Sequence, residues 1–198
     1  MDRYDHKAGT FDDLFKSIQE CKLSMTCSDR HVRQYYYENE NTASEYPVMF
    51  ICESPSTRGG YGNGSVRETC WMNTAEDHHF RSMLKEMGFE GAYITNFVKC
   101  GTKTKCKPTK YNLDKCLQFL LREIDIVKPR VIACVGKKLL GFAKKHLRDK
   151  AVILYVYHYS WSKRKGLYIP EKELASYQEI KRIFSNHSLH LDAATPRR

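Results

Sequence analysis

The hydrophobic and polar positions of this chain predict strands and helices in alternation. Short continuous apolar runs, typical of strands buried on both faces, are separated by apolar stripes at helical spacing. The predicted strands cover residues 48–52, 92–98, 131–135 and 151–156. The predicted helices are one from Thr10, one at 75–87, one with an apolar stripe from Leu113 to Val127, and two at 137–147 and 171–184.

Strands that alternate with helices form a parallel sheet covered on both faces. The predicted fold class is therefore α/β, a three-layer α/β/α arrangement around a four-stranded parallel sheet. We expect a single domain over residues 1–184 and a mobile C-terminal tail at 185–198.

Four residues lie at or just past the predicted strand ends: Glu53, Asn96, Gly136 and His158. In open parallel sheets, ligands bind outside the carboxyl ends of the strands. Asn96 belongs to an otherwise apolar strand, where a polar side chain is costly unless it is hydrogen-bonded. These positions predict a ligand site at one edge of the sheet.

Composition adds a candidate partner. The chain has 33 Lys and Arg against 23 Asp and Glu, a formal net charge of +10. Such an excess favours an anionic partner, with nucleic acid as the leading candidate. A basic segment after the second strand is expected to contact phosphates; its lysines are Lys99, Lys103, Lys105, Lys107 and Lys110.

The chain holds eight cysteines, but it shows no secretory signal and no apolar run of transmembrane length. We therefore expect an intracellular protein, cytoplasmic or in the nucleoid or nucleus, with reduced thiols or metal ligands rather than disulfides. Cys100 at the end of the second strand, together with Cys116 on the helix that follows, suggests a metal or cluster near the ligand site. Three other cysteines are expected to be small core residues: Cys52, Cys70 and Cys134.

Several motifs together resemble the uracil-DNA glycosylase superfamily, most closely its iron–sulfur type, family 4. The resemblance covers roughly residues 47–160. Its main pieces are Tyr93-Ile94-Thr95-Asn96-Phe97-Val98-Lys99-Cys100, the interval from there to Cys116, and Ile132-Ala133-Cys134-Val135-Gly136. Cys52-Glu53-Ser54-Pro55 is similar to the family's Gly-Glu-Ala-Pro, and His158-Tyr159-Ser160 to its His-Pro-Ser.

The resemblance implies a DNA repair enzyme that hydrolyses the N-glycosidic bond of uracil after the base is flipped into a pocket. Glu53 would stabilise the cationic sugar and activate water, and His158 would hydrogen-bond the departing base. Asn96 would read the edge of uracil, Trp71 would stack on the base, and backbone amides near Ser54 would line the pocket.

The resemblance also implies DNA contacts and a cofactor. The expected DNA-binding residues are Ser160, Lys163, Arg164, Lys103 and Lys105. A [4Fe–4S] cluster would be held by Cys21, Cys27, Cys100 and Cys116. The family's N-terminal pair is Cys-x-x-Cys, whereas five residues separate Cys21 from Cys27. Zinc, and Cys106 as a competing ligand, therefore remain alternatives.

Other departures leave the substrate open. Cys52 stands where the family has Gly, and Tyr159 stands where it has Pro. The alternatives are a non-catalytic module that binds DNA or uracil, and a glycosylase for another deaminated base such as hypoxanthine. No lysine is clearly placed as an imine-forming nucleophile, so we expect a monofunctional enzyme, acting as a monomer on DNA and without a membrane partner.

Overall fold

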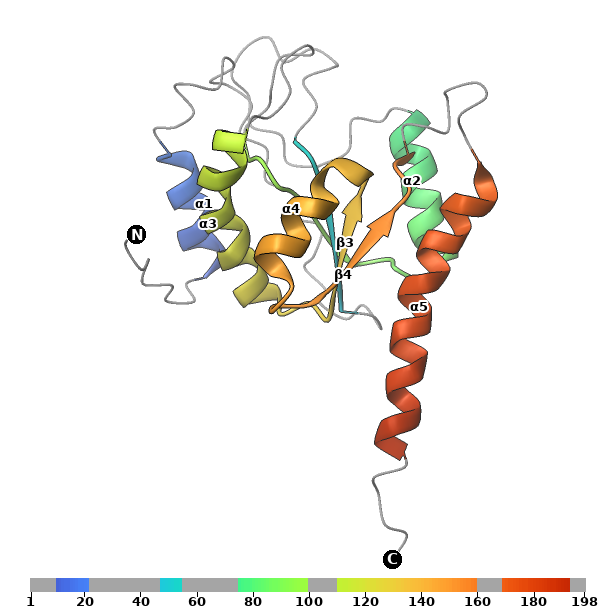
Figure 1. Ribbon diagram of the computed structural model, residues 1–198. Coiled ribbons are helices and arrows are strands. Elements are labelled where there is room, and N and C mark those ends of the chain that lie inside the picture. Colours follow the sequence, from blue (N-terminus) through green and yellow to red (C-terminus); the bar gives the residue numbers. More distant parts are fainter. Residues whose placement is uncertain (1–9, 22–46, 55–74, 100–109, 160–168, 193–198) are drawn as a thin grey trace, which may run out of the picture.

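The computed structural model describes residues 10–21, 47–54, 75–99, 110–159 and 169–192, drawn in colour in Figure 1. The strands are β1 (Val48–Cys52), β2 (Tyr93–Asn96), β3 (Val131–Val135) and β4 (Val152–Val156). The helices are α1 (Phe11–Gln19), α2 (Ala75–Glu86), α3 (Lys110–Val127), α4 (Lys137–Leu147) and α5 (Pro170–Asp192).

The four strands form one parallel sheet in the order β2-β1-β3-β4. Helices α1, α3 and α4 cover one face, and α2 and α5 cover the other (Figure 1). Alternate residues of each strand supply the two cores: Phe50 faces α2 and α5, whereas Met49 and Ile51 face α3 and α4. The predicted three-layer α/β/α class with a four-stranded parallel sheet is confirmed.

The connections between strands explain why a site forms at one point of the sheet edge. From β1 the chain passes through α2 to β2 on one side, and from β3 it passes through α4 to β4 on the other. The strand order therefore reverses between β1 and β3. In doubly wound sheets this switch point leaves a crevice outside the carboxyl ends of the strands, where ligands bind.

Local sequence signals set several element boundaries. Thr10 and Asp13 form a capping box at the start of α1: the Thr10 hydroxyl accepts from the Asp13 amide (3.2 Å), and the Asp13 carboxylate accepts from the Thr10 amide (3.0 Å). Gly88 ends the turn after α2 with φ +70°. Helix α5 continues past Phe184, its predicted end, to Asp192. The division into a domain at 1–184 and a mobile tail at 185–198 stays a prediction.

Strand β2 is shorter than the sequence indicated. It was predicted over 92–98, but it ends at Asn96, and Phe97 and Val98 bend away from the strand. Their amides instead donate to the carbonyl oxygens of Cys52 (2.8 Å) and Glu53 (3.1 Å). These bonds join the end of β2 to the end of β1, so the backbone carrying Asn96 and the backbone carrying Glu53 are fixed together.

Two cysteines sit in the core as predicted. Cys134 is fully buried in β3, and Cys52 is partly buried against the core on the opposite sheet face. Burial raises the pKa of each thiol to about 12, and at Cys52 the negative charge of Asp77 adds to this effect. Cys70 lies outside the described residues.

These raised pKa values predict inert thiols, because the thiolate is the reactive form. At about pH 8, iodoacetamide is expected to leave Cys52 and Cys134 unmodified in the native protein and to label both after denaturation in urea. Peptide mass spectrometry measures the labelling at each position. Rapid labelling of native Cys134 would contradict the buried placement.

Candidate active site

The predicted strand-end residues meet at the same edge of the sheet. Glu53 directly follows β1, Asn96 is the last residue of β2, Gly136 follows β3, and His158 lies two residues beyond β4. Cys52 is paired with Asn96 in register, and the β3–β4 pairing runs to the last residue of both strands. The four positions therefore lie around the switch point between β1 and β3.

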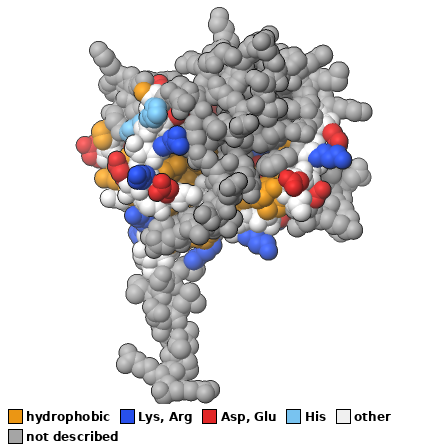
Figure 2. Space-filling model, turned by 180° about the vertical axis from the view of Figure 1, so that it is seen from behind, with side chains coloured by type: hydrophobic (Ala, Val, Ile, Leu, Met, Phe, Trp, Pro, Cys, Tyr) orange, Lys and Arg blue, Asp and Glu red, His pale blue; other side chains and the backbone are white. Residues whose placement is uncertain are grey.

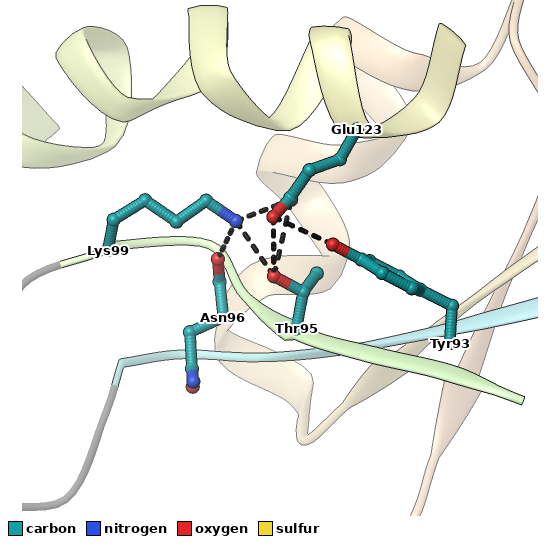
Figure 3. Close-up of polar contacts among 5 residues, drawn as sticks. All are labelled: Tyr93, Thr95, Asn96, Lys99 and Glu123. Atoms are coloured by element: carbon teal, nitrogen blue, oxygen red, sulfur yellow. Dashed lines mark hydrogen bonds and ion pairs between the residues drawn. The ribbon is translucent and has the colours of Figure 1, made fainter. Parts of the chain in front are cut away.

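Asn96 is buried, with 5% of its surface exposed. Its neighbour Thr95 shares the α3 side of the sheet with Tyr93, so alternation places the Asn96 side chain on the opposite side. Figure 3 shows the Asn96 amide pointing away from Thr95 and Glu123. An amide held this way offers a donor and an acceptor together, which suits the edge of a base.

Glu53 forms an ion pair that the sequence reasoning did not foresee. Lys138, in the first turn of α4, donates to both carboxylate oxygens of Glu53 at 2.9 and 3.3 Å. The Lys138 side chain is 62% exposed and that of Glu53 is 30% exposed, so solvent reaches the pair beside the strand ends. The available signal was the place of Lys138 in the first turn of the helix after β3, because the carboxyl end of β3 borders the switch point.

His158 is placed by contacts from several elements. Its ring stacks on Tyr159 (4.8 Å between centroids), and Tyr159 stacks on Phe80 of α2 (4.8 Å). The amide of the preceding residue, Tyr157, donates to Ser176 Oγ of α5 (3.2 Å). Tyr159 stands where the family has Pro. Through its two stacking contacts it joins the His158 ring to the aromatic core and restricts the movement of that ring.

Gly136 leaves room for the His158 ring. It has φ +94° and ψ 151°, a backbone conformation restricted essentially to glycine. A Cβ atom at this position would lie 3.1 Å from His158 Cδ2. An added Cβ would push the ring by a few tenths of an ångström, so glycine suits this position through its space as well as through its backbone conformation.

Lys99 does not belong to the exposed basic segment, contrary to the sequence prediction. It is 3% exposed, and its ammonium group pairs with the buried carboxylate of Glu123 in α3. Lysine is almost never buried unless it is paired. The run of lysines in the sequence therefore suggested that Lys99 is exposed and contacts phosphates. The signal for this pair was Glu123 itself, a carboxylate within the apolar stripe of α3.

The remaining predicted base- and DNA-binding residues are only partly covered by the structure. Ser54 is half-buried directly after Glu53. Trp71 lies outside the described residues. So do the predicted DNA-binding residues Ser160, Lys163, Arg164, Lys103 and Lys105.

The described part of the cysteine set is compatible with a metal or cluster. Cys21 directly follows the last turn of α1, and Cys116 lies near the start of α3; neither is in a disulfide. The two helices run antiparallel and side by side, so these helix ends lie at the same end of the molecule (Figure 1). Thiolates suit both iron–sulfur clusters and zinc. Cys27, Cys100 and Cys106 lie outside the described residues, and within the described ones no group of three or more possible ligands is assembled.

Figure 2 shows the molecule from behind. On this face the described Lys and Arg side chains are interspersed with Asp and Glu, so those residues form no patch of one charge.

A cavity of about 340 Å³ is lined by α2 and by residues leading into β2, among them Gly91 and Ala92. It therefore lies toward the amino end of that strand. No helix in the described ranges is long and apolar enough to cross a membrane.

Comparisons with known proteins agree with this arrangement. The model of the Uracil DNA glycosylase superfamily matches residues 40–181. A type-4 uracil-DNA glycosylase of Archaeoglobus fulgidus is 25% identical over 130 residues, which cover 65% of this chain and 60% of that protein. Those of Thermotoga maritima and Sulfurisphaera tokodaii are 39% and 30% identical over 62 and 93 residues, covering 30% and 46% of this chain and 32% and 40% of those proteins.

The chain spans 60% or less of the length of these curated relatives. The superfamily match, in contrast, covers well over half of the chain and includes all four strands and the strand-end residues. With its parallel sheet and switch-point site, and with its similarity to type-4 enzymes, the chain belongs to the uracil DNA glycosylase superfamily.

Proposed function

We propose that this protein is a monofunctional DNA glycosylase that hydrolyses the N-glycosidic bond of uracil in DNA. The observation that carries this proposal is the meeting of Glu53, Asn96 and His158 around the switch point of the sheet. Breaking an N-glycosidic bond builds positive charge on the sugar and negative charge on the departing base, and preorganised groups must meet both. A carboxylate, an amide and an imidazole at one edge supply such groups.

Each residue has a role that follows from its chemistry. Glu53 stabilises the cationic sugar and orients or activates water. Asn96 reads the edge of a flipped uracil and rejects a base that would leave its buried amide unpaired. His158 donates a hydrogen bond to the oxygen of the departing base. Ser54 lines the pocket, and Trp71 stacks on the flipped base.

The DNA contacts and the cofactor are part of the same proposal. Ser160, Lys163, Arg164, Lys103 and Lys105 would contact the DNA backbone. Cys21 and Cys116, together with Cys27 and Cys100, would hold a [4Fe–4S] cluster, with zinc as the alternative occupant. When bound, this group would tie together the segments that carry its ligands; the hydrolysis itself needs only the residues at the strand ends.

The test is a glycosylase assay on oligonucleotides that carry one lesion each, as single strands and as duplexes. We expect release of uracil and an abasic site without strand cleavage. Release of hypoxanthine but not uracil would mean that the enzyme's substrate base is hypoxanthine and not uracil. Tight binding of the uracil oligonucleotide without any base release would overturn the enzyme assignment in favour of a binding module.

The ion pair beside the strand ends predicts a role for Lys138. In Lys138→Ala, the two bonds that orient the Glu53 carboxylate are lost. We expect the single-turnover rate at saturating DNA to fall by roughly three- to tenfold, the range of one modest hydrogen-bond contribution. Stability should change by no more than about 1 kcal/mol, because the pair is exposed.

The matched control is Lys137→Ala. Lys137 precedes Lys138 in α4, and its ammonium group lies 5.8 Å from the centre of the Tyr155 ring. The same charge is removed from the same helix turn, so both variants lose a similar share of general attraction to DNA. Equal single-turnover rates for the two variants would contradict the assignment of Lys138 to Glu53.

A further inference from the structure

A buried polar network lies directly behind the backbone of Asn96 (Figure 3). Its centre is the Lys99 ammonium group, which contacts Thr95 Oγ1 (2.8 Å), the Asn96 carbonyl oxygen (2.6 Å) and Glu123 Oε2 (2.5 Å). The ammonium group has three donors, so this set of partners can use all of them.

The carboxylate of Glu123 is equally well satisfied. It is 3% exposed and accepts from the Tyr93 hydroxyl (3.2 Å) and from Thr95 Oγ1 (3.0 Å) as well as from Lys99. A buried ion pair of this kind is weak evidence for stability, because the desolvation of two charges offsets much of their attraction. The position of the pair therefore matters more than its strength.

The network holds the backbone of Asn96 and leaves its side chain free for the other side of the sheet. Figure 3 shows the Asn96 carbonyl facing Lys99 while the side-chain amide points away. One residue further on, the backbone is fixed from within the sheet, since the Phe97 and Val98 amides donate to the end of β1. Residues 96–99 are thus clamped between α3 and the strand end that carries Glu53.

We propose that Lys99, paired with Glu123, is a positioning residue that fixes Asn96 for base recognition. This inference rests on the proposed function, because Asn96 is taken as the residue that reads uracil. The Lys99 ammonium group holds the Asn96 carbonyl oxygen at the end of β2 and is itself held by Glu123 of α3. Helix α3 therefore sets the orientation of the Asn96 side-chain amide on the other side of the sheet. The clamp also fixes the distance between the Asn96 and Glu53 backbones through Val98.

Two variants separate positioning from stability. Glu123→Gln leaves Lys99 charged and buried without its counter-ion but still able to donate to the Asn96 carbonyl, so stability falls while affinity for free uracil stays within about twofold of wild type. Lys99→Met with Glu123→Gln removes both charges and keeps an acceptor for Tyr93 and Thr95. Its stability stays closer to wild type, whereas uracil affinity falls by roughly tenfold or more.

The measurements are urea denaturation, titration with free uracil, and kcat and KM on a uracil-containing oligonucleotide. The control is Lys150→Met, which removes a pair with Asp125 on the exposed part of α3 and should change neither uracil affinity nor kcat. A purely structural role predicts that uracil affinity follows stability across the variants. Wild-type affinity and kcat in the double variant would overturn the proposal.

Amide hydrogen exchange tests the clamp without any ligand. In the double variant, exchange at Val98 is expected to be about tenfold faster than in wild type, because the bend loses its anchor on α3. This readout does not require Glu123→Gln to fold. If wild-type protein neither binds nor releases uracil, the proposed function is wrong. The exchange rate at Val98 would still test whether Lys99 and Glu123 hold this part of the backbone. Unchanged Val98 exchange in the double variant counts against the clamp itself.

Discussion

Replacing Glu53 by Gln is expected to lower the single-turnover rate of uracil release by about 10²- to 10⁴-fold, the range of a positioned acid–base group. The substitution keeps the shape of the side chain and one acceptor oxygen but removes the negative charge. In the proposed mechanism that charge would face the sugar on which positive charge develops, so its loss is expected to raise the barrier to bond cleavage. Quenched-flow kinetics with excess protein over oligonucleotide measures the rate directly.

DNA binding should behave differently from catalysis in Glu53→Gln. In the proposed enzyme Glu53 lies on the surface that would meet phosphates, so removing its carboxylate weakens repulsion, and affinity for the oligonucleotide is expected to stay the same or to increase. Stability should change little, because within the described residues the pair that the substitution weakens is the exposed one with Lys138. A slow variant that binds DNA well would show that Glu53 acts on the reaction and not on docking.

Glu90→Gln is the matched control for this change. Glu90 is exposed in the turn before β2, at the amino end of that strand, so the same chemical substitution is made away from the strand ends. We expect wild-type rates from it. Uracil release by Glu53→Gln at the rate of Glu90→Gln would remove the carboxylate from the mechanism.

The sequence predicted the elements of the sheet well because each strand carries its own local signal. The apolar runs at β1 and β3 are buried on both faces, and such runs are hard to mistake for loops. The rule that ligands bind at the carboxyl ends of parallel strands then selected Glu53, Asn96 and His158, and the fold brings all three to one edge. These inferences needed only local pattern and chain direction.

The pairs between distant residues could not be predicted in the same way. Lys99 looked like one lysine among several in a basic segment, and only the packing of α3 on β2 shows that it is buried against Glu123. Lys138 looked like a surface residue of α4, and only the switch between β1 and β3 brings it to Glu53. Residue type indicates exposure on average, but the partner of a charge is set by tertiary structure.

Gly136 provides the second large prediction, because it tests the placement of His158 without touching that residue. Gly136→Ala is expected to lower the free energy of unfolding by about 1–3 kcal/mol, the cost of a side chain in this glycine-only conformation. The new Cβ would also meet the His158 ring at 3.1 Å. The ring must move, so uracil release should fall by at least about tenfold, approaching the roughly 10²- to 10³-fold loss expected for His158→Ala.

Gly141→Ala is the control, since it makes the same substitution five residues later in α4, where an added Cβ meets nothing within 4 Å. A glycine-to-alanine change inside a helix should raise stability by about 0.5–1 kcal/mol and leave the rate unchanged. Thermal denaturation and single-turnover assays compare the two variants.

A double variant decides whether Gly136 acts through His158. If the added Cβ harms catalysis by displacing the ring, Gly136→Ala should slow the reaction little further once His158 is already Ala, because residues in contact do not contribute independently. The backbone cost to stability should remain in the double variant, since it does not depend on the ring. If the rate loss of the double variant equals the product of the losses of the two single variants, Gly136 affects the reaction by a route other than His158. The close approach of His158 to the end of β3 would then play no part in catalysis.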